Sequence, residues 1–597
     1  MSKPALISII HDFADPGKPA LHRLMDPATG TWTPITCAEF RDKVLNFSAA
    51  LLSLGLEPQQ TLGIFSENRP EYLTASFAAW QIRCVTVGIY ATSSPEQVRY
   101  LVDDAKIATM VVGSQTHYDI ARQVGVKQII AIDPDIEFAE GDTTTLRFSK
   151  VLDMGHHASG EIRAKVAERA DAVTHDDLAT LLYTSGTTGE PKGAMLTHRN
   201  FTAAMEMHRR ALPMLSAADS SLNFLPLTHV FELAWSCLCL YLNMEIYVNT
   251  DPKRAQLSLR EVQPTCMCSV PRFWEKVYAV INEKLTNMGV FSKAMMNRAI
   301  AVGRKRNMDY VRKGLPVPRL LEMEYQSYNN RVFRKVRSLI GVNRGNIFPT
   351  AGAPVSPKIV EFFHAIGVNI LVGYGLSETT ATVTFNPAVN WELGSVGQVI
   401  GDVRIRIGDD DEVQVKGPTV MAGYFDLPEA TEAAFTSDGW FRTGDAGRID
   451  RNGNLFLTDR IKDLFKTANG KYIAPQALEM RLGRDSLFEQ VAIIGDSRKF
   501  VSALIVPDYA ELQRWAESHK LGHLSKAELA VNPKVIEHVQ ERIEAQTADL
   551  APYEHIRRFT LLTEPFSIEN GELTNTLKIR RRVIADRYAD EIDRMYL

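Results

Sequence analysis

The residues best suited to chemistry lie in a glycine- and threonine-rich loop that follows an apolar run, Leu178 to Tyr183. The run predicts a buried strand, because short continuous apolar segments are typical of strands covered on both faces. The loop then supplies Thr184, Ser185, Gly186, Thr187, Thr188, Gly189, Pro191, Lys192 and Gly193. Hydroxyls, backbone N–H groups beside glycine and a lysine ammonium are donors that polyphosphate oxygens accept. The spacing is not that of a P-loop, since Glu190 stands where that motif has lysine.

Two later turns carry groups suited to a nucleotide. They span Thr350 to Pro354 (TAGAP) and Val372 to Thr380 (VGYGLSETT). Glycines on either side of Tyr374 let the backbone approach a ligand while the aromatic ring stacks on it. Glu378 supplies a carboxylate, which is a hard oxygen ligand suited to Mg²⁺. The candidate residues of these turns are Gly352, Ala353, Gly373, Tyr374, Gly375, Ser377 and Glu378.

Two more segments complete the set of candidates. The turn GWFRTGDAGRID offers Asp445, a carboxylate that can accept both hydroxyls of a ribose. Near the C-terminus, GELTNTLKIRRR contains Lys578, the first lysine after Lys534. Arginines are frequent around it, so a positive charge alone did not require a lysine. A lysine provides a compact ammonium on a flexible stem, which indicates a specific role for Lys578.

In this order, the motifs closely resemble those of the AMP-forming adenylating enzymes, which include acyl-CoA synthetases, luciferases and the adenylation domains of peptide synthetases. The resemblance spans Leu178 to Lys578 and, with N-terminal sequence of matching type, covers essentially the whole chain. Within the family, three features are most similar to long-chain fatty-acid–CoA ligases. They are a basic insert at about residues 275–345, LPLTHVFE (Leu225 to Glu232) and TLKIRRR (Thr576 to Arg582).

The resemblance implies a two-step reaction. A fatty-acid carboxylate attacks the α-phosphorus of ATP, which gives an acyl-adenylate and pyrophosphate. The thiol of coenzyme A then attacks the adenylate carbonyl, so that acyl-CoA forms and AMP leaves. ATP and CoA are therefore the expected co-substrates of this AMP-forming acid–thiol ligase, and Mg²⁺ is its expected cofactor.

The resemblance also implies roles for single residues. Glu378 and Thr184 are expected to hold Mg²⁺, and Lys578 is expected to bridge the carboxylate and the α-phosphate, which makes these three the catalytic candidates. His229 and Gly373 are expected to border the acyl pocket. The expected ATP-binding set is Thr184, Ser185, Gly186, Thr187, Thr188, Gly189, Lys192, Gly352, Ala353, Tyr374, Gly375, Ser377, Asp445, Arg460 and Lys471.

Two departures from the family restrict what is carried over. Leu577 stands where smaller-acid relatives have glycine before the catalytic lysine. Some bacterial long-chain relatives close the acyl tunnel with a tryptophan four residues after the histidine, where this chain has Leu233. Trp235 lies on the wrong parity, so no gate residue is assigned.

The elements that must position these residues alternate between strand and helix patterns. Strands are expected at residues 61–65, 85–89, 108–112 and 128–132. Helices are expected to open at Thr36, Pro70 and Ser94. The alternation predicts an α/β fold, in which a large domain of helix-flanked mixed or parallel sheets and a β-subdomain precedes a small mobile α+β domain.

We place the domain boundary at Lys462, which gives domains of residues 1–461 and 462–597. By the same resemblance, Lys462 is the hinge about which the small domain rotates between the two half-reactions. The rotation is expected to bring the loop at residues 468–471 to the site.

The insert is predicted to be helical and basic, with Pro316 and Pro318 breaking its middle. From Lys284 to Arg344 it carries 14 lysines and arginines, against only Asp309, Glu322 and Glu324. This surplus fits either a solvated helical surface or an electropositive surface that attracts CoA phosphates or an anionic membrane.

Length and composition set further bounds. A chain of 597 residues exceeds a single core, and 45% hydrophobic with 23% charged residues is typical of a globular enzyme. The net charge of −4 argues against a nucleic-acid partner. No apolar run reaches 18 residues and no signal-peptide pattern is present, so we expect a cytoplasmic protein. Peripheral contact with the inner membrane face and a homodimer stay open.

Six cysteines include two C-x-C pairs, at residues 237/239 and 266/268. On strands, each pair would direct both thiols to one face, and four thiols suit zinc. Both pairs lie in apolar runs, where cysteine behaves as a small buried hydrophobe. Burial is the favoured interpretation.

Other functions fit parts of this pattern. An aryl or medium-chain acid–CoA ligase, or a ligase that passes its acyl-adenylate to a carrier protein, would share the motifs, because acyl chain length is weakly encoded. A nucleotide-binding regulator with a decayed site would not need to retain the four charged candidate residues of this chain, which are Glu378, Asp445, Arg460 and Lys578. A membrane-scaffolding protein would leave the loop after Tyr183 unexplained. The favoured prediction is a fatty acid–CoA ligase that prefers long chains.

Overall fold

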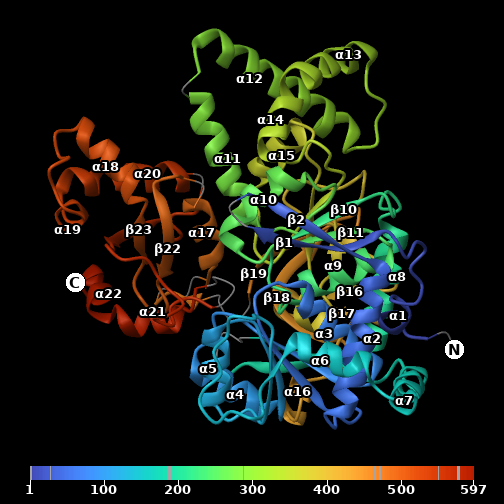
Figure 1. Ribbon diagram of the computed structural model, residues 1–597. Helices are drawn as coiled ribbons and strands as arrows, with labels where there is room; N and C mark the ends of the chain where they lie inside the picture. The colour runs from blue at the N-terminus through green and yellow to red at the C-terminus, as the bar shows by residue number, and fades with distance from the viewer. Residues whose placement is uncertain are drawn as a thin grey trace.

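The computed structural model describes residues 3–26, 29–184, 190–286, 288–460, 465–468, 472–483, 485–548, 550–574 and 579–597. Figure 1 shows a large body, a helical arm that projects from one end of it and a smaller C-terminal part beside it. The α/β architecture with one large and one small part agrees with the fold predicted from the sequence.

In the described part of the chain, the largest sheet has seven strands in the order β7-β6-β5-β3-β4-β8-β9. They are β3 (Thr61–Phe65), β4 (Val85–Ile89), β5 (Thr109–Val112), β6 (Gln128–Ala131), β7 (Leu146–Arg147), β8 (Leu178–Thr184) and β9 (Lys192–Thr197). Neighbouring strands are parallel, except that β8 and β9 form an antiparallel hairpin. The four expected strands and the buried strand before the loop are thus confirmed.

Helices cover both faces of this sheet. They include α2 (Cys37–Ser53), α3 (Pro70–Gln81), α4 (Pro95–Asp104) and α5 (Gln115–Gln123). Side chains of α2 and α3 pack with Leu62 of β3, whereas those of α4 and α5 pack in a second cluster with Phe65 of the same strand. Residues three apart on a strand point to opposite faces. Thr36 and Ser94 cap their helices in capping boxes, as the sequence predicts.

Two further four-stranded sheets belong to the large body. One sheet has the order β10-β11-β1-β2, with β10 (Ser220–Asn223), β11 (Glu245–Val248), β1 (Pro19–Asp26) and β2 (Thr31–Thr36). The other has β12 (Phe348–Thr350), β13 (Ile370–Tyr374), β14 (Thr384–Phe385) and β15 (Gln398–Val399). Single bridges through Cys266 and Ser269 connect β10 to β12.

Two helices accompany these strands, α8 (His198–Ala211) and α9 (Val230–Tyr241). The parity argument about Trp235 is wrong, because α9 is a helix and parity applies to strands. The same helix carries Cys237 and Cys239. All six cysteines are buried free thiols, and no group of three or more metal-ligating side chains occurs within the described ranges. The burial predicted for the C-x-C pairs is confirmed.

The β-subdomain is an antiparallel sheet of β16 (Arg404–Ile407), β17 (Glu412–Lys416), β18 (Phe441–Ile449) and β19 (Leu455–Arg460). It follows the central sheets in the chain and carries the aspartate turn within β18. The expected β-subdomain is therefore present.

The basic insert forms the projecting arm (Figure 1). It contains α11 (Pro271–Thr286), α12 (Val290–Arg304), α13 (Arg319–Tyr328) and α14 (Arg334–Ile340), with π-helical turns at Lys305–Val311 and Asn329–Phe333. Pro318 caps α13, so the prolines separate two helices as predicted. The arm packs on α15 (Pro357–Ala365) of the body through residues such as Phe333 and Phe363.

The C-terminal part has its own three-stranded sheet, β22 (Phe488–Ile494), β23 (Val501–Pro507) and β24 (Ile556–Leu561). Its helices include α17 (Pro475–Leu482), α18 (Tyr509–Ser518), α19 (Lys526–Ala530), α20 (Pro533–Thr547), α21 (Arg581–Arg587) and α22 (Ala589–Tyr596). Two apolar clusters of this part draw only on residues from Phe465 onward. The exact boundary at Lys462 lies outside the described residues and stays a prediction, as does the mobility of the domain.

Candidate active site

The strand ends on either side of the glycine-rich loop are well anchored. Thr184 and Lys192 pair across the β8–β9 hairpin, at the point where the loop leaves the sheet. The Tyr100 hydroxyl donates to the carbonyl oxygen of Pro191 at 2.9 Å. The Tyr183 hydroxyl donates to Asp104, and burial together with this carboxylate raises the pKa of the Tyr183 phenol. Helix α4, which carries Tyr100 and Asp104, thus fixes the base of the loop.

Glu378 lies beside this base. It belongs to a 3₁₀ turn, Ser377–Thr379, and its side chain is buried. The Thr184 hydroxyl lies 3.4 Å from Glu378 Oε1, although 194 residues separate the two in the chain. The structure therefore brings together the two residues predicted to hold Mg²⁺.

Sequence reasoning missed Tyr424, which completes this group. Its hydroxyl donates to Glu378 Oε1 at 3.0 Å, and Lys192 Nζ lies 5.1 Å from its ring centroid. The signal in the sequence was a glycine–tyrosine pair like the one at Gly373. Gly423 has φ +146°, and a Cβ there would lie 2.6 Å from the Thr431 side chain, so glycine is required beside Tyr424.

The nucleoside candidates also meet. The Tyr374 hydroxyl, at the end of β13, donates to Asp445 Oδ2 of β18 at 2.6 Å, and both side chains are buried. Gly375 follows Tyr374 in a tight passage, where a Cβ would lie 1.4 Å from the carbonyl oxygen of Ala381. Only glycine fits there. Arg460 of β19 pairs in register with Asp445, but its side chain lies outside the described part.

His229 is the N-cap of α9, where its Nδ1 accepts the N–H of Phe231 at 3.2 Å. This bond directs the proton of the neutral imidazole to Nε2. Three residues after His229, Glu232 is completely buried, and desolvation raises the pKa of its carboxyl group well above the ordinary value. Its Oε2 accepts the N–H of Leu225 at 3.1 Å.

The predicted site residues that the structure describes, apart from Arg460, line one cavity of about 2710 Å³. The predicted site residues on its wall are Thr184, Lys192, His229, Gly352, Ala353, Gly373, Tyr374, Gly375, Ser377, Glu378 and Asp445. A set of apolar side chains from α8, α9 and their flanks lines the same cavity: Phe201, Ala204, Met205, Leu212, Ala234, Trp235 and Leu238. The residues predicted to bind the nucleotide and these apolar side chains therefore line one continuous cavity.

The C-terminal part lines this cavity too, through residues that include Thr574, Ile579 and Arg580. A bridge joins Leu573 to Ile579, on either side of the segment that contains Lys578. The remaining candidates, Ser185, Gly186, Thr187, Thr188, Gly189, Lys462, Lys471 and Lys578, lie outside the described residues. Their roles stay predictions.

Comparison with known proteins agrees with this geometry. Residues 12–425 match the family described as AMP-binding enzyme, and residues 462–597 match the AMP-binding enzyme C-terminal domain. The chain is 33% identical to long-chain-fatty-acid–CoA ligase FadD15 of Mycobacterium bovis, over 98% of this chain and 96% of that protein. It is 30% identical to human long-chain-fatty-acid–CoA ligase 1, over 92% and 80% of the two chains.

Solved structures share the fold. The ATP-bound MatB of Rhodopseudomonas palustris superimposes with a TM-score of 0.70 at 21% identity, over 99% of this chain and 100% of that one. The adenylation domain of a carboxylate reductase from Mycobacterium chelonae gives a TM-score of 0.74 at 19% identity, over 99% and 91%. Among the described residues, no helix is long and apolar enough to cross a membrane.

Proposed function

Because the chain belongs to the AMP-binding enzyme family, we propose that it is an ATP-dependent fatty acid–CoA ligase with a preference for long chains. One observation carries this proposal: the nucleotide-type residues and the apolar wall of α8 and α9 line the same cavity. A carboxylate at the end of an acyl chain can therefore lie near a bound triphosphate. Curated relatives that match over almost the whole chain carry the name of this activity, which supports the proposal.

The first half-reaction requires that an anionic carboxylate approach an anionic phosphate. Glu378 and Thr184 present hard oxygen ligands 3.4 Å apart, which fits a Mg²⁺ ion that takes its other ligands from phosphates and water. When bound, this ion would offset phosphate charge. Tyr424 holds the Glu378 carboxylate by its 3.0 Å hydrogen bond, and Lys192 adds a cation at the loop base. We propose that Lys578 bridges the reacting carboxylate and the α-phosphate.

The nucleoside would lie on the opposite side of this group. We assign adenine to the space between Tyr374 and the turn at Gly352, which has φ +89° and open space where a side chain would stand. Asp445 is assigned to the ribose hydroxyls, with its orientation fixed by the Tyr374 hydroxyl at 2.6 Å. A preorganised nucleoside site of this kind raises the fraction of productive encounters.

The second half-reaction needs room for CoA after pyrophosphate has left. A cavity of about 2710 Å³ exceeds the roughly 300–1,000 Å³ of a site for one small ligand. Since both parts of the chain line it, we propose that rotation of the small domain about Lys462 replaces Lys578 by the loop at residues 468–471. CoA would then reach the acyl-adenylate through the space between the two parts.

For its cellular context, we propose a cytoplasmic enzyme in peripheral contact with an anionic membrane face. Fatty acids partition into membranes, so a ligase that consumes them benefits from lying there. A homodimer is compatible with this arrangement.

The decisive experiment is release of AMP that depends on CoA, measured with free acids of increasing chain length. We expect saturated or monounsaturated acids of roughly 12 carbons or more to be preferred, because each buried CH₂ adds about 0.8 kcal/mol of transfer free energy. An optimum at acetate or at an aromatic acid would contradict the long-chain assignment. Accumulation of acyl-adenylate without any acceptance of CoA would instead indicate a ligase that serves a carrier protein.

A further inference from the structure

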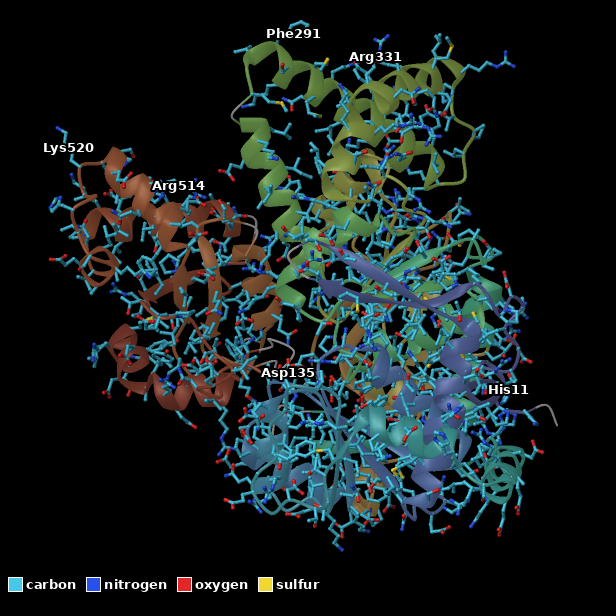
Figure 2. All side chains as sticks on the ribbon, in the orientation of Figure 1. His11, Asp135, Phe291, Arg331, Arg514 and Lys520 are labelled. Carbon is cyan, nitrogen blue, oxygen red and sulfur yellow. The ribbon has the colours of Figure 1, made fainter. Side chains whose placement is uncertain are left out.

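The arm ends in apolar side chains that are exposed to solvent. Val290 and Phe291, at the start of α12, are 89% and 84% exposed, and Met288 and Met295 are also exposed. We name these four residues the apolar tip. Figure 2 shows Phe291 and Arg331 at the outer end of the arm. Exposed apolar residues in a cluster mark an interaction surface, whereas single ones are normal.

Helix α13 also has exposed apolar side chains. Leu320 and Met323 of α13 are 82% and 71% exposed, while Leu321 and Tyr325 of the same helix are buried. The apolar residues that α13 needs for packing are thus already on its inner face. Packing within the chain does not explain the outer pair.

The charges of the arm divide into two groups. Four arginines are satisfied internally by ion pairs of 2.6–3.0 Å: Arg298 with Glu324, Arg304 with Glu361, Arg306 with Glu322 and Arg312 with Glu392. Exposed cations with no ion-pair partner in the described part of the arm include Lys284, Lys293, Lys305, Lys313, Arg319, Arg331 and Lys335. Lys293 belongs to the same helical turn as Phe291, so a cation accompanies the apolar tip.

We propose that the apolar tip inserts into an anionic phospholipid bilayer while the surrounding cations contact its headgroups. Apolar side chains flanked by lysine and arginine are the pattern of segments that lie in the membrane interface. A second copy of the chain fits less well, because a symmetric contact would bring two copies of the same cationic surface together.

The position of the arm relates this membrane contact to uptake of the acyl chain. This argument rests on the function proposed above. Arg272, Phe273 and Lys276, near the start of α11, line the cavity. Helix α11 then runs to Thr286, just before the apolar tip. Its 16 residues span about 24 Å at 1.5 Å per residue. A bilayer that holds the tip therefore lies about one helix length from the cavity that would receive the acyl chain.

The test is co-flotation of the full-length protein with vesicles of phosphatidylglycerol and phosphatidylcholine, at low and at high salt. The double variant V290Q/F291Q should reduce partitioning by about tenfold or more at both salt concentrations. The variant K293Q/R331Q should reduce binding at low salt only, because charge attraction is screened at high salt. The matched control M25Q/V531Q removes two exposed apolar residues outside the arm and should bind as the wild type does.

Each other outcome overturns the proposal. Unchanged binding of V290Q/F291Q, no binding by the wild-type protein, or wild-type binding abolished by salt would each exclude insertion of the tip. A change of oligomeric state in V290Q/F291Q, measured by analytical ultracentrifugation, would assign the tip to a second copy instead. Flotation does not depend on turnover, so AMP release assayed with a dissolved acid separates this proposal from the proposed function. V290Q/F291Q should keep that activity.

Discussion

At the scale of single residues, the site depends on a carboxylate held by two hydroxyl groups from distant segments. Thr184 and Tyr424 both approach Glu378 Oε1, at 3.4 and 3.0 Å. A carboxylate so oriented keeps its place before any ligand binds. Preorganisation of this kind lowers the cost of assembling a charged transition state.

Replacing Tyr424 tests this orientation. Y424F removes the hydroxyl that contacts Glu378 and keeps the ring beneath Lys192. A hydrogen bond to a charged group is worth about 1.5–3 kcal/mol, so kcat/KM for ATP should fall roughly ten- to hundredfold. The measurement is AMP release as a function of ATP and Mg²⁺, and the Mg²⁺ requirement should rise. An exposed tyrosine variant, Y553F, serves as the control, and equal losses in both would exclude a specific role for Tyr424.

A second residue-scale prediction concerns stability and pH. Burial raises the pKa of Glu232 well above its ordinary value of 4.5, so the folded state binds a proton that the unfolded chain has released. Its contribution to stability is present in full below pH 4.5 and is lost as the pH rises toward the folded pKa. E232Q, which carries no titratable group there, should therefore gain in Tm relative to the wild type as the pH rises from 5 to 8. A Tm difference that is constant across this range would contradict a buried protonated Glu232.

At the scale of elements, the passage between β13 and the Ser377–Thr379 turn sets the distance from Tyr374 to Glu378. G375A would place a Cβ 1.4 Å from the Ala381 carbonyl oxygen, so the backbone must shift. Overpacking of this severity costs about 3 kcal/mol. We expect a lower Tm and a loss of acid-dependent exchange of pyrophosphate into ATP.

Gly160 provides the matched control for this prediction. It opens helix α7 (Gly160–Asp171), and a Cβ there meets nothing within 4 Å. G160A should leave the exchange activity unchanged and raise the Tm slightly, because alanine favours helix. If G375A behaved like G160A, the close approach at Gly375 would be irrelevant to the site.

At the scale of the whole molecule, the proposed rotation assigns different half-reactions to two lysines. K578A should slow adenylation by on the order of 10²–10³, because a charge interaction made mainly in that transition state is lost. With preformed acyl-adenylate, the same variant should form acyl-CoA at a near-normal rate. K462P fixes φ near −65° and restricts the preceding residue, so it should keep adenylation and lose thioester formation.

The two half-reactions are measured separately, by pyrophosphate exchange without CoA and by thioester formation from the supplied adenylate. Equal loss of both in a folded K578A protein would show that the lysine is wrongly assigned. Equal loss in K462P would remove the support for a rotating domain. Exchange that appears in the wild type only when CoA is present would contradict a separate adenylation step.

Much of this protein follows from local sequence alone. The strands from Thr61 to Ala131 and the capping boxes at Thr36 and Ser94 depend on periodicity and turn chemistry within a few residues. The motifs and their order also predicted the chemistry, because each motif places particular side chains on a glycine-rich turn. Local rules failed where a short apolar run was ambiguous, and Trp235 proved to lie on a helix and to line the cavity.

Only the tertiary structure decided which groups meet. Tyr374 and Asp445 are 71 residues apart, and Tyr424 lies 46 residues from Glu378, so no local pattern specifies their hydrogen bonds. Folding likewise reduces the number of arm cations that remain without an ion-pair partner. Glu361 and Glu392 of the body pair with Arg304 and Arg312. Such pairings depend on how the sheets and helices pack. Composition counts charges, but burial and distance decide which of them remain for a partner.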